Sequence, residues 1–182
     1  ALEKDILLAK KLGFNGIRMH QKVESNVFYY LCDKLGMYVW GEIPSAYEYT
    51  DRMKREFGED CLKIVRQLKV YPCIIAWVIF NESWGIPEIK NNRECQLFVE
   101  AIQRKVRAED PTRLIVINDG WHQLNGDLLT LHEYEQNAET LLKEYRDKNY
   151  VVGEKLINQN RWGKSFADNY TYSHQAVIIS EF

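Results

Sequence analysis

The sequence predicts an α/β fold built around a parallel sheet, and three observations lead to this prediction. Helical and strand-like patterns alternate from the first residues onward. The clearest apolar runs, 74–80 and 176–180, are continuous rather than alternating, which is typical of strands buried on both faces. Polar residues follow nearly every strand. Repeated βα units with right-handed crossovers then allow an open doubly wound sheet or a closed barrel.

The first half of the chain alternates regularly between helices and strands. Apolar residues at helical spacing predict helices over 2–12, 27–35 and 53–68, and Gly13 and Gly36 end the first two. Strands are predicted between these helices, over 14–19, 37–40 and 74–80.

The second half continues the pattern with one irregular connection. A helix is predicted between Glu88 and Glu109, where Asp110-Pro111 stops it, and a shorter helix around 141–145. Strands are predicted over 114–117 and 176–180, with a weaker one over 128–131 and a polar loop over 153–175. Residues 119–127 are too few for a crossover helix, so either a loop replaces it or the weaker strand is misread.

The polar residues at the strand ends favour the barrel, because an open sheet usually concentrates its site at one switch point. They are Arg18, His20, Glu42, Asn81, Glu82, Asn118, Asp119, His132 and Glu181. No strand is followed by a glycine-rich nucleotide-binding motif, which removes support from the open sheet. The fold class is therefore α/β, a TIM (β/α)8 barrel. Six strands are predicted where such a barrel has eight, so we expect residues 1–182 to be a single catalytic-domain fragment lacking the first and last strands.

Two acids, Glu82 and Glu181, each stand where a buried apolar strand ends. An ionisable group in such a place costs desolvation energy and usually serves a purpose. In barrels this end of the strands carries the active site. A pair of acids there indicates cleavage of a glycosidic bond, which needs one acid to protonate the leaving oxygen and one carboxylate opposite it.

Composition excludes several other classes of function. The 24 Lys and Arg nearly balance the 26 Asp and Glu, so no basic footprint for nucleic acid exists. No apolar run is long enough for a membrane span, and no signal peptide is visible. The cysteines and histidines lack ligand spacing, which predicts structural thiols and neither a metal nor a cofactor. The 5 Trp and 11 Tyr agree with carbohydrate binding, although a large aromatic core explains them too.

Four segments resemble glycoside hydrolase family 2, the group of β-galactosidases, β-glucuronidases and β-mannosidases. They are the G-x-N-x-I-R strand at 13–20, the helix and strand through G-E-I-P at 31–44, the acid/base segment at 71–83 and the nucleophile strand at 179–182. Endo-acting cellulase- or mannanase-like barrels of the same clan tend to carry Asn-Glu-Pro, whereas this chain has Asn81-Glu82-Ser83.

The resemblance implies a retaining mechanism. Glu82 would be the general acid and then the general base, kept protonated by an apolar wall of Trp77 and Trp84 and by the nearby charge of Glu181. Glu181 would be the nucleophile, kept ionised by hydrogen-bond donors.

The resemblance also implies residues that support or bind the substrate. Arg18 and Tyr134 would be the donors to Glu181, and Asn81 would bind the sugar 2-hydroxyl. A core tyrosine with a satisfied hydroxyl explains Tyr134 nearly as well. Further candidates for the pocket are His20, Glu42, Asn118, Asp119, Trp121 and His132, with Trp84 and Trp162 as stacking platforms.

The implied substrate is a terminal β-linked sugar, with β-galactosidase-like activity first and β-glucuronidase or β-mannosidase as alternatives. A non-catalytic carbohydrate-binding relative is the alternative from another class. The resemblance also implies further β-sandwich domains in the full-length protein and leaves a homo-oligomer open. We expect the 182 residues alone to be inactive. The location, cytoplasmic or periplasmic and secreted, is left open.

Overall fold

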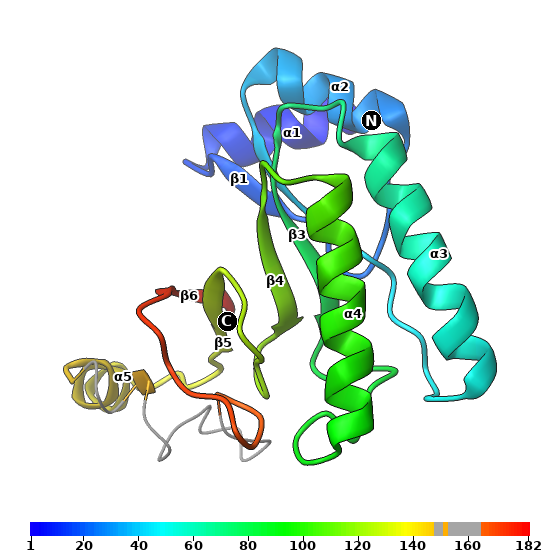
Figure 1. Cartoon of the computed structure of the whole chain (residues 1–182). Coiled ribbons are helices and arrows are strands. Elements are labelled where there is room, and N and C mark those ends of the chain that lie inside the picture. Colours follow the sequence, from blue (N-terminus) through cyan, green and yellow to red (C-terminus); the bar gives the residue numbers. More distant parts are fainter. Residues whose placement is uncertain (148–150, 153–164) are drawn as a thin grey trace.

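The structure is a computed structural model that describes residues 1–147, 151–152 and 165–182. Figure 1 shows helices packed against a curved set of strands. The elements, in chain order, are α1 (Leu2–Lys11), β1 (Gly16–Arg18), α2 (Asn26–Leu35), β2 (Tyr38–Glu42), α3 (Asp51–Leu68), β3 (Ile74–Asn81), α4 (Arg93–Glu109), β4 (Leu114–Asp119), β5 (Leu128–His132), α5 (Ala138–Tyr145) and β6 (Ala176–Glu181).

The predicted alternation of helices and strands is confirmed, with two local differences. The weaker strand is real, as β5, and residues 120–127 form a loop in place of a crossover helix. Helix α4 begins at Arg93, later than predicted, because the side chain of Asn92 caps it by accepting a hydrogen bond from Cys95 N at 3.2 Å.

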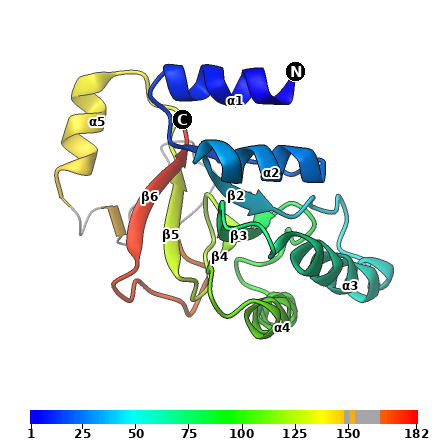
Figure 2. The same ribbon diagram turned by 90° about the horizontal axis from the view of Figure 1, so that it is seen from above.

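All strand pairs in the described residues are parallel, but they fall into two sheets. One sheet has the order β1-β2-β3-β4 and the other pairs β5 with β6. Strand β5 lies beside β4 without joining its ladder (Figure 2). The loop before β5 explains the break, since Asp127 bonds to the backbone of Ile115 at both its N–H and its C=O. The outer edge of β4 is therefore occupied by a loop at that point.

The strands follow a curve, and helices α2, α3 and α4 lie on its outer side (Figure 2). Five residues, one from each strand from β2 to β6, pack together on the inner side: Trp40, Val78, Val116, Leu128 and Ile178. A larger apolar cluster lies between the strands and the helices. This two-layer packing is that of a (β/α) barrel, so the predicted fold class is confirmed, and six of its strands are present in the described residues.

Trp77 belongs to the outer layer, and the expectation that it forms a wall beside Glu82 is wrong. Its indole N–H donates to Asp110 Oδ2 at 2.8 Å, where α4 ends. A Cβ at Gly41 would lie 2.7 Å from the Trp77 ring, so the neighbouring strand needs glycine there. Glu82 lies five positions after Trp77 along the chain, a rise of about 16 Å in an extended strand.

The four cysteines are free and buried, which agrees with the prediction that they are structural thiols. Burial raises the pKa of Cys61 to about 12 and that of Cys32 to about 11, so both thiols stay protonated at neutral pH. In the described ranges, no helix combines the length and apolar character that crossing a membrane requires.

Candidate active site

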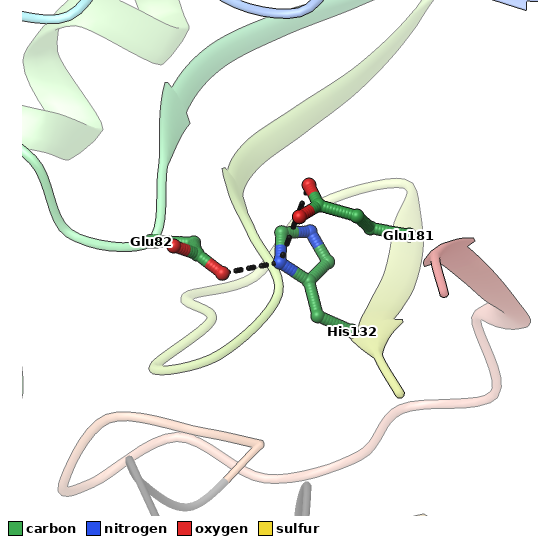
Figure 3. A group of neighbouring side chains, drawn as sticks. All are labelled: Glu82, His132 and Glu181. Carbon is green, nitrogen blue, oxygen red and sulfur yellow. Dashed lines mark hydrogen bonds and ion pairs between the residues drawn. The ribbon is translucent and has the colours of Figure 1, made fainter. Parts of the chain in front are cut away.

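The site lies where the C-terminal ends of the strands meet. Glu82 directly follows β3, His132 ends β5 and Glu181 ends β6. Figure 3 shows the three side chains pointing toward one another. One oxygen of each carboxyl group and one ring nitrogen of His132 all lie within 4.8 Å of one another. The sequence prediction that both acids share one end of the sheet is therefore confirmed.

The backbone that presents Glu82 is held in an unusual conformation. Glu82 and Ser83 have φ angles of 49° and 62°, in the left-handed region that non-glycine residues rarely adopt. Glu82 N donates to Asp119 O at 2.9 Å, and Ser83 N donates to the Asn118 side chain at 2.9 Å. Asn118 also donates to the carbonyl oxygen of Trp121 at 2.6 Å. Asn118 is thus a fully buried support beneath the turn rather than a pocket wall.

His132 connects the Glu82 carboxyl group to a buried aspartate. Its Nδ1 lies 2.7 Å from Glu82 Oε1, and its Nε2 lies 3.5 Å from Asp119 Oδ2. Burial opposes a charge on the ring, but the acidic groups of Asp119 and Glu82 beside it outweigh burial and raise the pKa of His132 to about 9. The raised pKa of His132 favours the imidazolium form, in which Nδ1 donates to Glu82.

Gly120 and Trp121 fix the position of this imidazolium. A Cβ at Gly120, whose φ is 103°, would lie 2.9 Å from His132 Nδ1. The Trp121 ring meets the His132 ring edge-on, with 5.7 Å between the ring centroids. The turn after β4 therefore packs directly against His132, and it leaves no room for a side chain at position 120.

Glu181 receives hydrogen bonds from two donors. The Tyr134 hydroxyl group donates to Oε1, and Arg18 Nη1 donates to Oε2 at 2.7 Å. Burial alone would raise the pKa of Glu181, but the bonds from Tyr134 and Arg18 lower it below its ordinary value. The same contact, together with burial, raises the pKa of Tyr134. Glu181 is accordingly a carboxylate across the neutral range.

Arg18 lies between the members of an acidic cluster, which comprises Glu42, Asp119 and Glu181. Its Nε lies 2.9 Å from Glu42 Oε2 and 2.9 Å from Asp119 Oδ2, and its Nη2 donates to Asn81 Oδ1 at 2.5 Å. Glu42 is fully buried beneath the guanidinium and so does not line a pocket. Burial, aided by the charge of Asp119 and opposed by Arg18, raises the pKa of Glu42 to about 7.

Three side chains near the site were not anticipated from the sequence. The Ser180 hydroxyl group donates to Asp119 Oδ1 at 2.6 Å, which fixes the aspartate between Arg18 and His132. Tyr47 and His122 line a hollow beside Glu82. Tyr47 lies in the loop after β2, at the same edge of the sheet as Glu82, and this position was the available signal.

His20, Trp84 and Trp121 lie at the margin of the site. The His20 side chain is half-exposed, and its Nδ1 lies 3.6 Å from Glu42 Oε1 and 4.0 Å from Glu181 Oε2. Trp84 and Trp121 line the hollow beside Glu82. Trp162 lies outside the described residues.

Glu82, His132 and Glu181 have the residue types and the spacing of a metal site. Their facing atoms are, however, already paired with one another, since His132 Nδ1 lies 2.7 Å from Glu82 Oε1 and 3.7 Å from Glu181 Oε2. The three side chains therefore form a hydrogen-bonded and ion-paired group.

The family model of glycosyl hydrolases family 2, TIM barrel domain, matches residues 1–182. The chain belongs to this family.

Two curated relatives show the range of activities among similar proteins. The chain is 31% identical to a β-glucuronidase of Bacteroides fragilis over 120 residues, which cover 61% of this chain and 16% of the relative. It is 29% identical to a β-galactosidase of Yersinia pestis over 130 residues, which cover 66% of this chain and 11% of the relative. The chain thus spans a small part of each of these two relatives.

Solved structures of similar proteins agree with the fold. A family 2 member from Bacteroides cellulosilyticus matches 80% of this chain and 21% of its own, with a TM-score of 0.63 at 23% identity. Bacteroides uniformis β-glucuronidase 2, covalently bound to cyclophellitol-6-carboxylate aziridine, matches 63% of this chain and 15% of its own, with a TM-score of 0.54 at 27% identity.

Proposed function

We propose that the protein is a retaining glycosidase that cleaves terminal β-linked sugars by double displacement, with Glu82 as acid/base and Glu181 as nucleophile. The observation that carries this proposal is the approach of the two carboxyl groups, with an oxygen of each within 4.8 Å. Retaining glycosidases hold their carboxyl groups about 5–5.5 Å apart, whereas inverting enzymes need about 6.5–9.5 Å to admit a water.

In the first step, Glu181 attacks the anomeric carbon and forms a glycosyl ester, while the bond to the leaving oxygen breaks. The leaving oxygen receives a proton from Glu82, and Glu82 takes that proton from the His132 ring, whose Nδ1 lies 2.7 Å from Glu82 Oε1. In the second step, Glu82 takes a proton from water, and the water oxygen replaces Glu181 at the anomeric carbon. Both displacements invert that carbon, so its configuration is kept overall.

The partners of Glu181 and Asn81 suit these roles. Arg18 and Tyr134 donate hydrogen bonds to Glu181. These bonds keep Glu181 ionised for the attack and stabilise its carboxylate again when it departs in the second step. The side-chain oxygen of Asn81 accepts a hydrogen bond from Arg18, so Asn81 would meet the sugar 2-hydroxyl through its amide nitrogen. Such a contact strengthens in the transition state.

The relatives support the chemistry and leave the sugar to be tested. The covalent adduct of Bacteroides uniformis β-glucuronidase 2 agrees with a nucleophilic side chain in this family. β-Galactosides are the substrates we propose first, and β-glucuronides and β-mannosides are the alternatives. A non-catalytic sugar-binding protein is disfavoured because both carboxyl groups are present and paired with donors.

The first experiment is the hydrolysis of aryl β-galactoside, β-glucuronide and β-mannoside by the full-length protein. In the next, Glu181→Gln should abolish turnover while sugar binding remains. Glu82→Ala should impair substrates with poor leaving groups far more than activated aryl glycosides, and azide should restore part of its turnover.

A control variant on α5 and the configuration of the azide product complete the test. Glu139→Gln removes an exposed carboxyl group on α5 and should leave turnover unchanged. The product of azide rescue should be the β-glycosyl azide. An α-glycosyl azide, or full turnover by Glu181→Gln, would contradict the proposal.

A further inference from the structure

Glu133 is a buried carboxyl group beside the site that takes no part in the proposed chemistry. It directly follows the last residue of β5 and is 4% exposed. An ionisable group in such a place costs free energy unless it is hydrogen-bonded. Its Oε1 accepts a hydrogen bond from Glu135 N at 2.8 Å, and its Oε2 accepts one from the Tyr145 hydroxyl group at 2.9 Å. Both oxygens are thus bound by groups outside the site.

Glu133 points away from the site, whereas both of its neighbours in the chain point into it. His132 contacts Glu82, and Tyr134 donates to Glu181. This arrangement agrees with the alternation of side chains along an extended chain. Glu133 therefore lies between two residues of the site and joins the chain at that point to α5.

Helix α5 is attached to the sheet through Tyr145. The structure describes all of Ala138–Tyr145, and no residue of this helix is buried. Tyr145 is half-buried, and its ring packs against a small apolar cluster that comprises Leu129, Leu131, Val151 and Phe166. Burial and the contact with Glu133 raise the pKa of Tyr145, so its hydroxyl group stays protonated and is the donor to Glu133.

Consecutive hydrogen bonds from side chain to backbone hold the segment between β5 and α5. Glu133 accepts from Glu135 N, Glu135 accepts from Asn137 N at 2.8 Å, and the Asn137 side chain caps α5. Glu133 N donates to Glu181 O at 2.9 Å, which extends the contact between β5 and β6 by one residue. Tyr134 therefore has a hydrogen-bonded residue on each side of it.

Tyr134 depends on this segment for its position. It is 44% exposed, so packing holds its ring on one side only, and the main chain must direct its hydroxyl group to Glu181 Oε1. His132, by contrast, lies within β5, is fully buried and packs against Gly120. A change at Glu133 should therefore disturb Tyr134 and leave His132 in place.

We propose that Glu133 and Tyr145 are positioning residues that hold the Tyr134 hydroxyl group on Glu181. The inference rests on the proposed function, in which Glu181 is the nucleophile. Helix α5 then supports the nucleophile from outside the site, through the bond from Tyr145 to Glu133, the adjoining main chain and the bond from Tyr134 to Glu181. Glu133 and Tyr145 act through Tyr134 and not on the substrate.

The test compares Tyr145→Phe with Tyr170→Phe in the full-length protein, on the aryl β-glycoside that the unaltered protein hydrolyses fastest. Both rings pack against the small apolar cluster and both hydroxyl groups donate to a glutamate, but the partner of Tyr170 is Glu100 on α4. Tyr145→Phe should lower kcat and kcat/KM together by about 10-fold, because a misplacement of about 1 Å can cost about 100-fold. Tyr170→Phe should leave both unchanged.

The pH profile provides a readout that a general loss of structure would not move. The acid limb of kcat/KM follows Glu181, which must be ionised. The bond from Tyr134 lowers the pKa of Glu181, so a weaker bond in Tyr145→Phe should move this limb to higher pH. The basic limb follows Glu82 and should stay in place. The other charged or titratable groups near Glu181 keep their contacts in this variant, and they are Arg18, His20, His132 and Glu82.

Two further comparisons show whether the effect passes through Tyr134. When Tyr134→Phe has already removed the hydroxyl group, adding Tyr145→Phe should lower kcat/KM no further. Glu133→Leu loses both hydrogen bonds and should lower kcat/KM more than Tyr145→Phe does. Glu133→Gln keeps an oxygen for Glu135 N and a polar group for Tyr145, and it should retain most of the activity.

Each contrary result has a distinct meaning. Full activity of Tyr145→Phe beside an active unaltered protein would overturn the positioning role alone. An equal fall in Tyr170→Phe would also overturn it, because the loss would then come from packing on the small apolar cluster. A shift of the basic limb would show that the pair supports His132 and Glu82 instead of Tyr134. If the unaltered protein hydrolyses none of the aryl glycosides, the proposed function fails and the positioning role fails with it.

Discussion

Replacing Arg18 with methionine should separate the structural part of the cluster from its catalytic part. The guanidinium is 13% exposed and contacts Glu42, Asp119, Asn81 and Glu181. Glu42 and Asp119 are fully buried, so the variant leaves two buried carboxyl groups without this cation. Removing one partner of a buried ion pair costs about 3–5 kcal/mol. That is a large fraction of the roughly 5–15 kcal/mol by which a typical domain is stable.

The double variant Arg18→Met/Glu42→Leu should recover much of this loss. An apolar pair of similar volume is often as stable as the buried ion pair it replaces. We expect a coupling free energy of about 2–3 kcal/mol between the two positions. Activity should not return, because Glu181 and Asn81 still lack the guanidinium, and kcat/KM should stay at least about 100-fold below that of the unaltered protein.

The assay is a double-mutant cycle in urea, with kcat/KM measured on the same four proteins. If activity returns together with stability, Arg18 acts only through the fold, and its assignment as a partner of Glu181 is wrong. If the two positions show no coupling, the pairing of Arg18 Nε with Glu42 Oε2 at 2.9 Å is wrong.

Three further predictions follow from single contacts. Stability should fall as the pH rises from about 6 to 9. His132 and Glu42 have raised pKa values in the folded state, about 9 and about 7, so each stabilises the fold at lower pH and loses that contribution as the pH rises through its folded-state pKa. A free energy of unfolding that rises over this range would contradict this prediction. Gly120→Ala should lower the free energy of unfolding by about 1–3 kcal/mol and should lower kcat. Gly13 has a φ of 95°, but a Cβ there would have no atom within 4 Å, so Gly13→Ala should destabilise the protein less and leave kcat unchanged. Equal losses of stability would refute the contact between position 120 and His132. Trp77→Phe loses the bond to Asp110 and should cost about 1–2 kcal/mol with kcat unchanged; a large fall in kcat would show that Trp77 reaches the site.

Much of the fold and the location of the site follow from the sequence because parallel strands bring their C-terminal ends together. Once 74–80 and 176–180 are assigned as strands, Glu82 and Glu181 must lie at the same edge. The pairing of Asn81 with Asp119 in the ladder shows how closely these ends align.

The sequence could not show which side chains face one another across that edge. His132 approaches Glu82 because the turn at Gly120 lets its ring lie against the backbone, which depends on packing between β4 and β5. Trp77 faces outward because side chains alternate along β3, and a continuous apolar run hides that alternation. Ser180 contacts Asp119 from β6, which among the described strands pairs with β5 alone, so no local pattern predicts the bond.

The most direct test of the mechanism is to trap the glycosyl-enzyme on the full-length protein. A 2-deoxy-2-fluoro-β-glycosyl fluoride of the preferred sugar slows both displacements, but its good leaving group allows the ester to form and accumulate. Mass spectrometry of the intact protein and of its peptides should find one added fluorosugar, on the peptide that contains Glu181. A label on Glu82, or no label together with a product of inverted anomeric configuration, would contradict the account.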